Sequence, residues 1–185
     1  MTGLITLLVL ALITYLVWPR NKWVAIANWY TLIDGMQFSS ELFYTAVSQE
    51  LKTRQVPAIR IGRRTFATGS ILSHKRLYME IQRGSYMFHV CAAPFGTGFF
   101  VSWWLREKLS WFDQFLMKWP GMRKIVEARQ DKPYYYWDTG NMFKTTVQNA
   151  VLGVIDQITN EQGVRGLRDH ERMPSRDITR QSVKP

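Results

Sequence analysis

The first eighteen residues of the chain contain no charged side chain, and the first charges that follow are Arg20 and Lys22. An α-helix rises about 1.5 Å per residue, so this segment would reach roughly 27 Å, close to the ~30 Å hydrocarbon core of a bilayer. Trp18 and Trp23 would then lie at headgroup level, where Arg20 and Lys22 can reach phosphates. The segment predicts a transmembrane anchor over residues 1–18.

Two other interpretations of this segment are weaker. A cleaved signal peptide needs basic residues before the apolar stretch and small residues at its end. Here no Lys or Arg precedes the stretch, and it ends in the bulky sequence Tyr-Leu-Val-Trp. A buried core helix would have to be apolar on every side within a large domain, which a chain of this size can scarcely provide. The anchor is therefore favoured.

The distribution of charge predicts an orientation, because Lys and Arg near a span favour its cytoplasmic side. All 24 Lys and Arg residues follow the segment, against 14 acidic residues and a formal net charge of +10. This bias predicts a single-pass protein of the cell inner membrane, with the N-terminus outside and residues 20–185 in the cytoplasm. The lone Cys91 agrees with that location, because exported domains of this size more often pair their cysteines.

The charge and the aromatic content together indicate partners. A basic cytoplasmic domain beside a bilayer faces anionic lipid headgroups, with about 1 kcal/mol for each well-placed cation. The chain also contains eight Trp, eight Tyr and ten Phe, and Trp and Tyr are enriched at lipid interfaces and at protein–protein hot spots. We therefore expect anionic lipid headgroups and other integral membrane subunits as partners.

Residues 19–38 are expected to form a juxtamembrane segment. Within it, residues 23–33 carry an apolar stripe at helical spacing, typical of an interfacial helix or of an extension of the spanning helix. Trp29 lies off that stripe and completes the expected interfacial residues. Asp34-Gly35 ends the segment.

Residues 39–163 predict an α+β domain. Helical spacing appears at 41–54, at 105–119 and from Asp138 or Thr139 to about Asn160, whereas alternation typical of strands runs through 58–104, with a shorter strand at 134–137. The predicted fold is an N-terminal single transmembrane helix followed by a small antiparallel sheet covered by amphipathic helices. Residues 164–185 read as a basic polar tail.

No residue pattern predicts catalysis or a cofactor. His89 and Cys91 are two apart on a predicted strand and could give zinc two ligands, but no further Cys or His lies near them in the sequence. Gly96-Thr97-Gly98 lacks the third glycine and the lysine of nucleotide-binding loops. We expect no catalytic, cofactor-binding or metal-binding residue.

A group of basic residues stands out against this background. The group combines two short basic runs with the ends of a predicted strand, and we expect it to contact an anionic partner: Arg60, Arg63, Arg64, Lys75, Arg76 and Arg83. Tyr78 and Tyr86 lie among them, as in platforms that stack single-stranded nucleic acid. The cations occupy both faces of the predicted strands, however. Membrane headgroups or an acidic subunit are therefore favoured over a plain solvated surface, and nucleic acid is unlikely.

The stretch FHVCAAPFGTGFFVSWWL at 88–105 and the stretch NAVLGVIDQIT at 149–159 resemble an uncharacterised family of bacterial membrane proteins. The similarity runs from about residue 40 to about residue 170. Members of that family carry apolar spanning segments after the Trp-Trp-Leu sequence, whereas this chain continues with the charged stretch 106–119. The resemblance implies a bacterial membrane-associated domain and no catalytic activity.

These observations predict a non-enzymatic, membrane-anchored accessory subunit of a larger membrane protein complex, such as a respiratory, photosynthetic, transport or secretion assembly. Its basic, Trp-rich domain would dock on the cytoplasmic face of that complex. The alternatives are a peripheral protein that binds anionic lipid and a membrane-tethered protein that binds nucleic acid.

Overall fold

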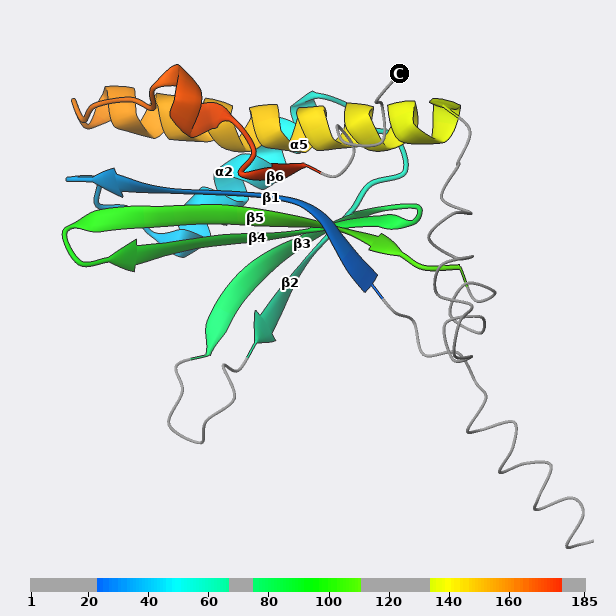
Figure 1. Cartoon of the computed structure of the whole chain (residues 1–185). Coiled ribbons are helices and arrows are strands. Elements are labelled where there is room, and N and C mark those ends of the chain that lie inside the picture. Colours follow the sequence, from blue (N-terminus) through cyan, green and yellow to red (C-terminus); the bar gives the residue numbers. More distant parts are fainter. Residues whose placement is uncertain (1–22, 67–74, 111–133, 178–185) are drawn as a thin grey trace, which may run out of the picture. The chain divides into compact units, whose positions relative to one another are not determined.

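A computed structural model describes residues 23–66, 75–110 and 134–177. The chain divides into two compact units. The first, residues 1–24 and 108–132, lies almost entirely outside the described ranges. The second, residues 25–107 and 133–185, contains the sheet and the helices of Figure 1 and is the subject of all that follows.

The described strands form one sheet in the order β2-β3-β4-β5-β1-β6. They are β1 (Trp23–Asp34), β2 (Arg60–Phe66), β3 (Arg76–Arg83), β4 (Tyr86–Phe95), β5 (Gly98–Lys108) and β6 (Arg176–Asp177). Strands β2 to β5 form an antiparallel meander. The β3–β4 turn contains Gly84 with a φ of +56°, a left-handed conformation that glycine adopts without strain.

Both long helices pack on the same face of the sheet (Figure 1): α2 (Ser40–Thr53), which connects β1 to β2, and α5 (Tyr134–Glu161), which follows the meander. Side chains alternate along a strand, so one set faces the helices and the other faces away. On β4, for example, Phe88 and Val90 of the inward set are fully buried together with Val47 of α2 and Val147 of α5. The core is therefore a single layer between the sheet and the two helices.

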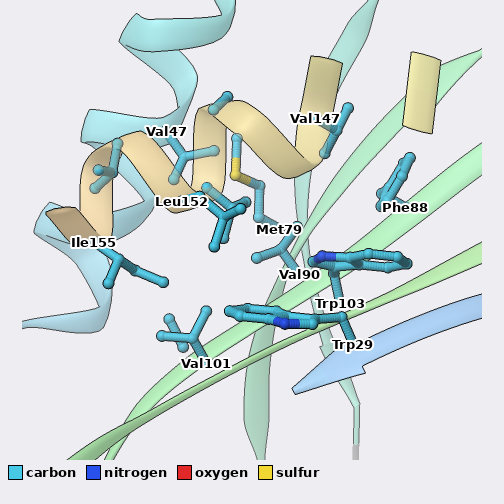
Figure 2. Close-up of a cluster of buried hydrophobic side chains, with 14 of the residues drawn as sticks. Trp29, Val47, Met79, Phe88, Val90, Val101, Trp103, Val147, Leu152 and Ile155 are labelled. Carbon is cyan, nitrogen blue, oxygen red and sulfur yellow. The ribbon is translucent and has the colours of Figure 1, made fainter. Parts of the chain in front are cut away.

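Two tryptophans form the centre of this core. Trp29 of β1 and Trp103 of β5 are 1% and 0% exposed, and Figure 2 shows both indoles with Leu152 and Ile155 of α5 among the surrounding side chains. The ring of Phe88 packs edge to face on Trp103 at a centroid distance of 5.3 Å. Burying aromatic side chains of this size supplies much of the apolar area that stabilises a small domain.

The C-terminal segment 164–177 is attached to this core. The indole Nε1 of Trp29 donates a hydrogen bond to the Glu171 carbonyl oxygen at 2.7 Å. Arg172 binds the Asp156 carboxylate of α5 through two nitrogens, at 2.6 and 2.9 Å. The short strand β6 then pairs with β1. Residues 164–177, which the sequence assigns to a basic polar tail, therefore belong to the folded domain, while 178–185 lie outside the described residues.

The predicted transmembrane fold class is also corrected. Within the ranges that the structure describes, no helix combines the length and the apolar character needed to cross a bilayer. The fold is a largely antiparallel sheet with two helices on one face. The predicted single-pass placement at the inner membrane does not fit this fold. The segment 1–18 itself lies outside the described residues.

Other predicted elements divide into confirmed and wrong ones. The helix predicted at 41–54 is confirmed as α2, and the strands predicted within 58–104 are confirmed as β2 to β5. The helix predicted at 23–33 is instead strand β1, because its buried residues alternate from Ala27 to Ile33. Residues 105–108 continue strand β5, and the rest of the helix predicted at 105–119 lies almost wholly outside the described residues.

The short strand predicted at 134–137 is wrong for a different reason. Its four aromatic residues have high strand propensity, yet they form the first turn of α5. Contacts far along the chain favour the helix: the Tyr136 hydroxyl bonds with Ser85 of the β3–β4 turn and with Glu107 of β5. Tertiary contacts of this kind override local propensity.

Two glycines of α5 give a matched test of the helix packing. A Cβ at Gly140 would lie 2.8 Å from the buried Tyr86 hydroxyl, whereas a Cβ at Gly153 would meet nothing within 4 Å. We expect Gly140→Ala to lower the free energy of unfolding by about 1–3 kcal/mol through overpacking. Gly153→Ala should raise it by roughly 0.5–1 kcal/mol, because alanine favours the helix. Urea denaturation followed by circular dichroism measures both, and equal effects would contradict the packing.

Candidate functional site

The face of the sheet that points away from α2 and α5 is the candidate site, and we call it the outer face. Strand alternation and the pairing register assign its residues. The outer face combines arginines, aromatic rings and a few polar side chains, among them Arg60, Arg64, Phe66, Arg76, Tyr78, Glu80, Met87, His89, Cys91, Phe95, Phe100, Ser102, Trp104 and Arg106. On β1 the same alternation assigns Tyr30 and Leu32 to it.

A polar network crosses strands β2, β3 and β4 on this face. Glu80 pairs with His89 in the register, and His89 Nε2 lies 3.0 Å from Glu80 Oε1. The guanidinium of Arg64 donates to the same oxygen at 3.5 Å. Arg64 also lies over the Phe66 ring at 5.2 Å, and Phe66 packs edge to face on His89 and on Tyr78. The network therefore fixes the positions of an arginine, an imidazole and two aromatic rings.

His89 and Cys91 are both held in their neutral forms. Burial lowers the pKa of His89, and this effect outweighs the hydrogen bond to Glu80, which favours the charged imidazolium. Burial likewise raises the pKa of the Cys91 thiol, which shares a hydrogen bond with Tyr78. A buried protonated thiol is a poor nucleophile. Both side chains are therefore neutral, and His89 is fixed in place by Glu80.

Several large apolar side chains of the outer face remain exposed. Tyr30 and Leu32 of β1 are 59% and 44% exposed, and Trp104 of β5 is 44% exposed. Single exposed apolar residues are ordinary, but three on adjacent strands of one face form a feature typical of interaction surfaces.

Strands β3 and β4 diverge at one end of the sheet. Their pairing ends at Met79 and Val90, and the β2–β3 hairpin turns away from β4 and β5 in Figure 1. The hydroxyl of Tyr44 from α2 lies in the gap, where it donates to the Leu77 carbonyl at 2.8 Å and accepts from the Ala92 N–H at 2.9 Å. One side chain thus replaces the missing ladder bonds between the two strands.

Proline at position 94 suits the same divergence. The Ala92 N–H points away from β5, towards β3, and residue 94 has the same orientation two positions later. A donor at residue 94 would therefore face the gap without a strand partner. Proline has no N–H, so none is left unpaired.

A cleft opens on the outer face at this divergence. Its volume is about 350 Å³, and it is lined by Arg76, Ala93, Pro94, Phe95 and Phe100. Among the described residues, the walls are apolar apart from the Arg76 guanidinium. Phe95 is 64% exposed although it is aromatic.

A second polar cluster lies on the inward face, where α5 begins. The Tyr136 hydroxyl donates to Glu107 Oε1 at 2.5 Å and lies 2.9 Å from Ser85 Oγ. The Tyr86 hydroxyl donates to the Tyr136 carbonyl at 3.4 Å, and its pKa is raised by burial and by the adjacent Tyr136 hydroxyl. The Tyr86 hydroxyl therefore stays protonated and acts as a hydrogen-bond donor. These hydrogen bonds together fix the start of α5.

The structure separates the basic residues that we expected to act together. Arg60, Arg64 and Arg76 lie on the outer face, with Arg60 and Arg76 at opposite ends of the β2–β3 hairpin. Arg63 points to the helix side, where it pairs with Glu41 of α2. Arg83 donates to the Pro57 carbonyl at 3.1 Å.

Two further features bear on this basic group. Lys75 is exposed immediately before β3. Strand β2, which carries Arg60, Arg63 and Arg64, is an edge of the sheet among the described strands. Charged side chains on an edge discourage pairing with other chains, so part of this charge has a protective role.

Of the residues expected at a membrane interface, the structure describes Trp23 and Trp29. Trp18, Arg20 and Lys22 lie outside the described residues, and Trp23 is the first residue of β1. Trp29 is buried in the core, which corrects its assignment to an interface. The physical reason is strand alternation, which points the Trp29 side chain to the helix side of β1.

His89 and Cys91 share the outer face of β4, as their spacing indicates. Within the described ranges, no group of three or more His, Cys, Asp or Glu side chains could hold a metal ion. Sequence reasoning missed Glu80 as the partner of His89, Tyr44 as the bridge across the gap, and the exposed Tyr30 and Trp104. The pairing of Glu80 with His89 had one signal in the sequence, which is the isolated acidic residue Glu80 within the alternating stretch 76–83.

Comparison with known proteins gives little further information. No family model and no curated protein matches the chain. The chain is similar to a solved structure described as the di-domain ARO/CYC StfQ from the steffimycin biosynthetic pathway, with 11% sequence identity and a TM-score of 0.32. The similarity covers 75% of this chain, and the chain spans about half, 52%, of that structure. A likeness this distant carries no functional conclusion.

The role of Tyr44 can be tested by removing one atom. Tyr44→Phe leaves the Ala92 N–H and the Leu77 carbonyl without their partner, so we expect the free energy of unfolding to fall by about 1–3 kcal/mol. Tyr135→Phe removes a hydroxyl from a residue that is 63% exposed and should change it by less than about 0.5 kcal/mol. Urea denaturation compares the two variants, and equal stabilities would refute the bridge.

The neutral state of His89 predicts a dependence of stability on pH. Its folded-state pKa lies below the ordinary value of 6.5, so the unfolded chain takes up this proton first as the pH falls. The free energy of unfolding should therefore decrease as the pH falls below about 6.5.

Urea denaturation at pH 7.5 and pH 5.5 measures this loss of stability. In His89→Gln the difference between the two pH values should be smaller, while the contribution of the carboxylates remains. An unchanged difference would show that His89 does not cause it.

Proposed function

We propose that the chain is a non-enzymatic accessory subunit of a larger protein assembly, and that the outer face is its docking surface. The observation that carries the proposal is the exposure of Tyr30, Leu32 and Trp104 on a face that neither α2 nor α5 covers. The cores of protein–protein interfaces are enriched in aromatic residues and arginine, and Tyr, Trp and Arg dominate their binding energy.

The charges of the outer face indicate the chemistry of the partner. Arg60, Arg64 and Arg76 point to it, together with the acidic Glu80. Opposite charges across an interface steer encounters and fix orientation. The partner is therefore a protein surface that is acidic and offers apolar contacts.

The packing of the aromatic residues favours a protein partner over nucleic acid. Phe66 packs edge to face on Tyr78, with an interplanar angle of 89°, and on His89, with an angle of 79°. Stacking of bases needs free ring faces in succession, whereas these rings are used against one another.

The experiment is affinity purification of the intact, tagged chain from the cells that produce it, with quantitative mass spectrometry. The double variant Tyr30→Ala/Trp104→Ala should lower the enrichment of the specific partner at least tenfold, because truncation at a hot spot costs about 2 kcal/mol or more. The matched control Tyr135→Ala/Met142→Ala removes two exposed side chains from α5 and should retain the partner.

Three results would contradict the proposal. The first is equal enrichment with the two double variants. The second is purification of the intact chain without any partner protein. The third is binding to anionic vesicles or to single-stranded oligonucleotides that the double variant Tyr30→Ala/Trp104→Ala abolishes while no protein partner is lost.

A further inference from the structure

We propose that the cleft between the diverging strands β3 and β4 binds a carboxylate carried on a flat apolar group. Arg76 would pair with the carboxylate, and Phe95 and Phe100 would contact the apolar part. The proposal concerns a carboxylate in this cleft and is independent of the docking role of Tyr30 and Trp104.

The first argument is that the opening is maintained by dedicated residues. A gap between two strands normally leaves backbone groups unpaired, and each buried unpaired group destabilises the fold. Here the Tyr44 hydroxyl satisfies both Leu77 and Ala92, and Pro94 removes the next donor. The two strands therefore stay apart without unpaired groups at these positions.

The second argument is the chemistry of the walls. Ala93, Pro94, Phe95 and Phe100 supply apolar surface, and Arg76 is the charged residue of the lining within the ranges that the structure describes. Among the described residues Arg76 makes no ion pair, and the two titratable groups whose pKa values its charge lowers, Tyr78 and Cys91, are neutral. Its charge is therefore available to a ligand.

The third argument concerns size and the type of anion. The cleft of about 350 Å³ falls within the range of small-molecule sites, roughly 300–1,000 Å³. A guanidinium matches a carboxylate through two parallel hydrogen bonds. A single cation suits one negative charge better than a phosphate dianion, and the apolar walls suit a ring.

The test uses 2-naphthoate and its neutral amide, 2-naphthamide, as probes of the full chain in an NMR titration. We expect 2-naphthoate to bind with a dissociation constant on the order of 1 mM, as suits a ligand of this size. Shifts should centre on the amides of Arg76, Ala93 and Phe95, and the amide probe should bind at least tenfold more weakly.

Exposed-residue variants make the assignment specific without threatening the fold. Arg76→Gln should weaken 2-naphthoate at least tenfold and leave 2-naphthamide unchanged, and Phe95→Ala should weaken both. The matched control Arg60→Gln removes an exposed arginine from the other end of the same hairpin and should bind like the natural chain. The docking variant Tyr30→Ala/Trp104→Ala should also bind normally, so that either proposal can fail alone.

A hexapeptide that ends in phenylalanine distinguishes two sources of the same chemistry. If the free acid of this peptide binds more tightly than 2-naphthoate, and the peptide with a C-terminal amide does not bind, the cleft is assigned to a protein C-terminus. If the free acid binds more weakly than 2-naphthoate, the cleft is assigned to a small free acid. The proposal is overturned by absence of binding at 20 mM probe, by equal affinity for 2-naphthoate and 2-naphthamide, or by equal effects of Arg76→Gln and Arg60→Gln.

Discussion

The packing of both long helices against one face of the sheet is the constraint on which the remaining features depend. It concentrates the large apolar side chains, including Trp29 and Trp103, in a single layer. The opposite face must then be stabilised without a covering helix from the described part of the chain. It achieves this with short-range contacts between neighbouring strands, such as the Glu80–His89 bond and the edge-to-face rings around Phe66. A face organised in this way is rigid and still accessible.

The hydroxyl of Tyr44 extends this constraint to the shape of the outer face. It comes from α2, on the helix side, yet it sets the separation of β3 and β4. The core and the cleft are therefore coupled through one side chain. A continuous ladder would close the gap, because pairing would then continue beyond Met79 and Val90. The cleft thus depends on a helix residue that does not line it.

The sequence predicted α2, strands β2 to β5 and most of α5 correctly, since the last helix was expected from Asp138 or Thr139 to about Asn160. Residues 41–104 alternate or repeat clearly, so α2 and strands β2 to β5 follow from periodicity. The segments 23–33 and 134–137 are rich in aromatic and β-branched residues that suit either helix or strand, and long-range contacts decide between them. The candidate site was harder, because the Glu80–His89 pairing and the position of Tyr44 depend on strand register and helix placement. A single sequence specifies neither.

The basic residues show why total charge describes this protein incompletely. A net charge of +10 suggests one anion-binding surface, but strand alternation sends Arg63 and Arg83 to the opposite side from Arg64. Several cations are already used in the fold, since Arg63 pairs with Glu41 and Arg172 with Asp156. Exposed pairs of this kind contribute little stability, so their main effect is to leave fewer cations free. In the proposed cleft, recognition would then depend on Arg76 together with Phe95, because the two residues line the same cleft and would select both a charge and a shape.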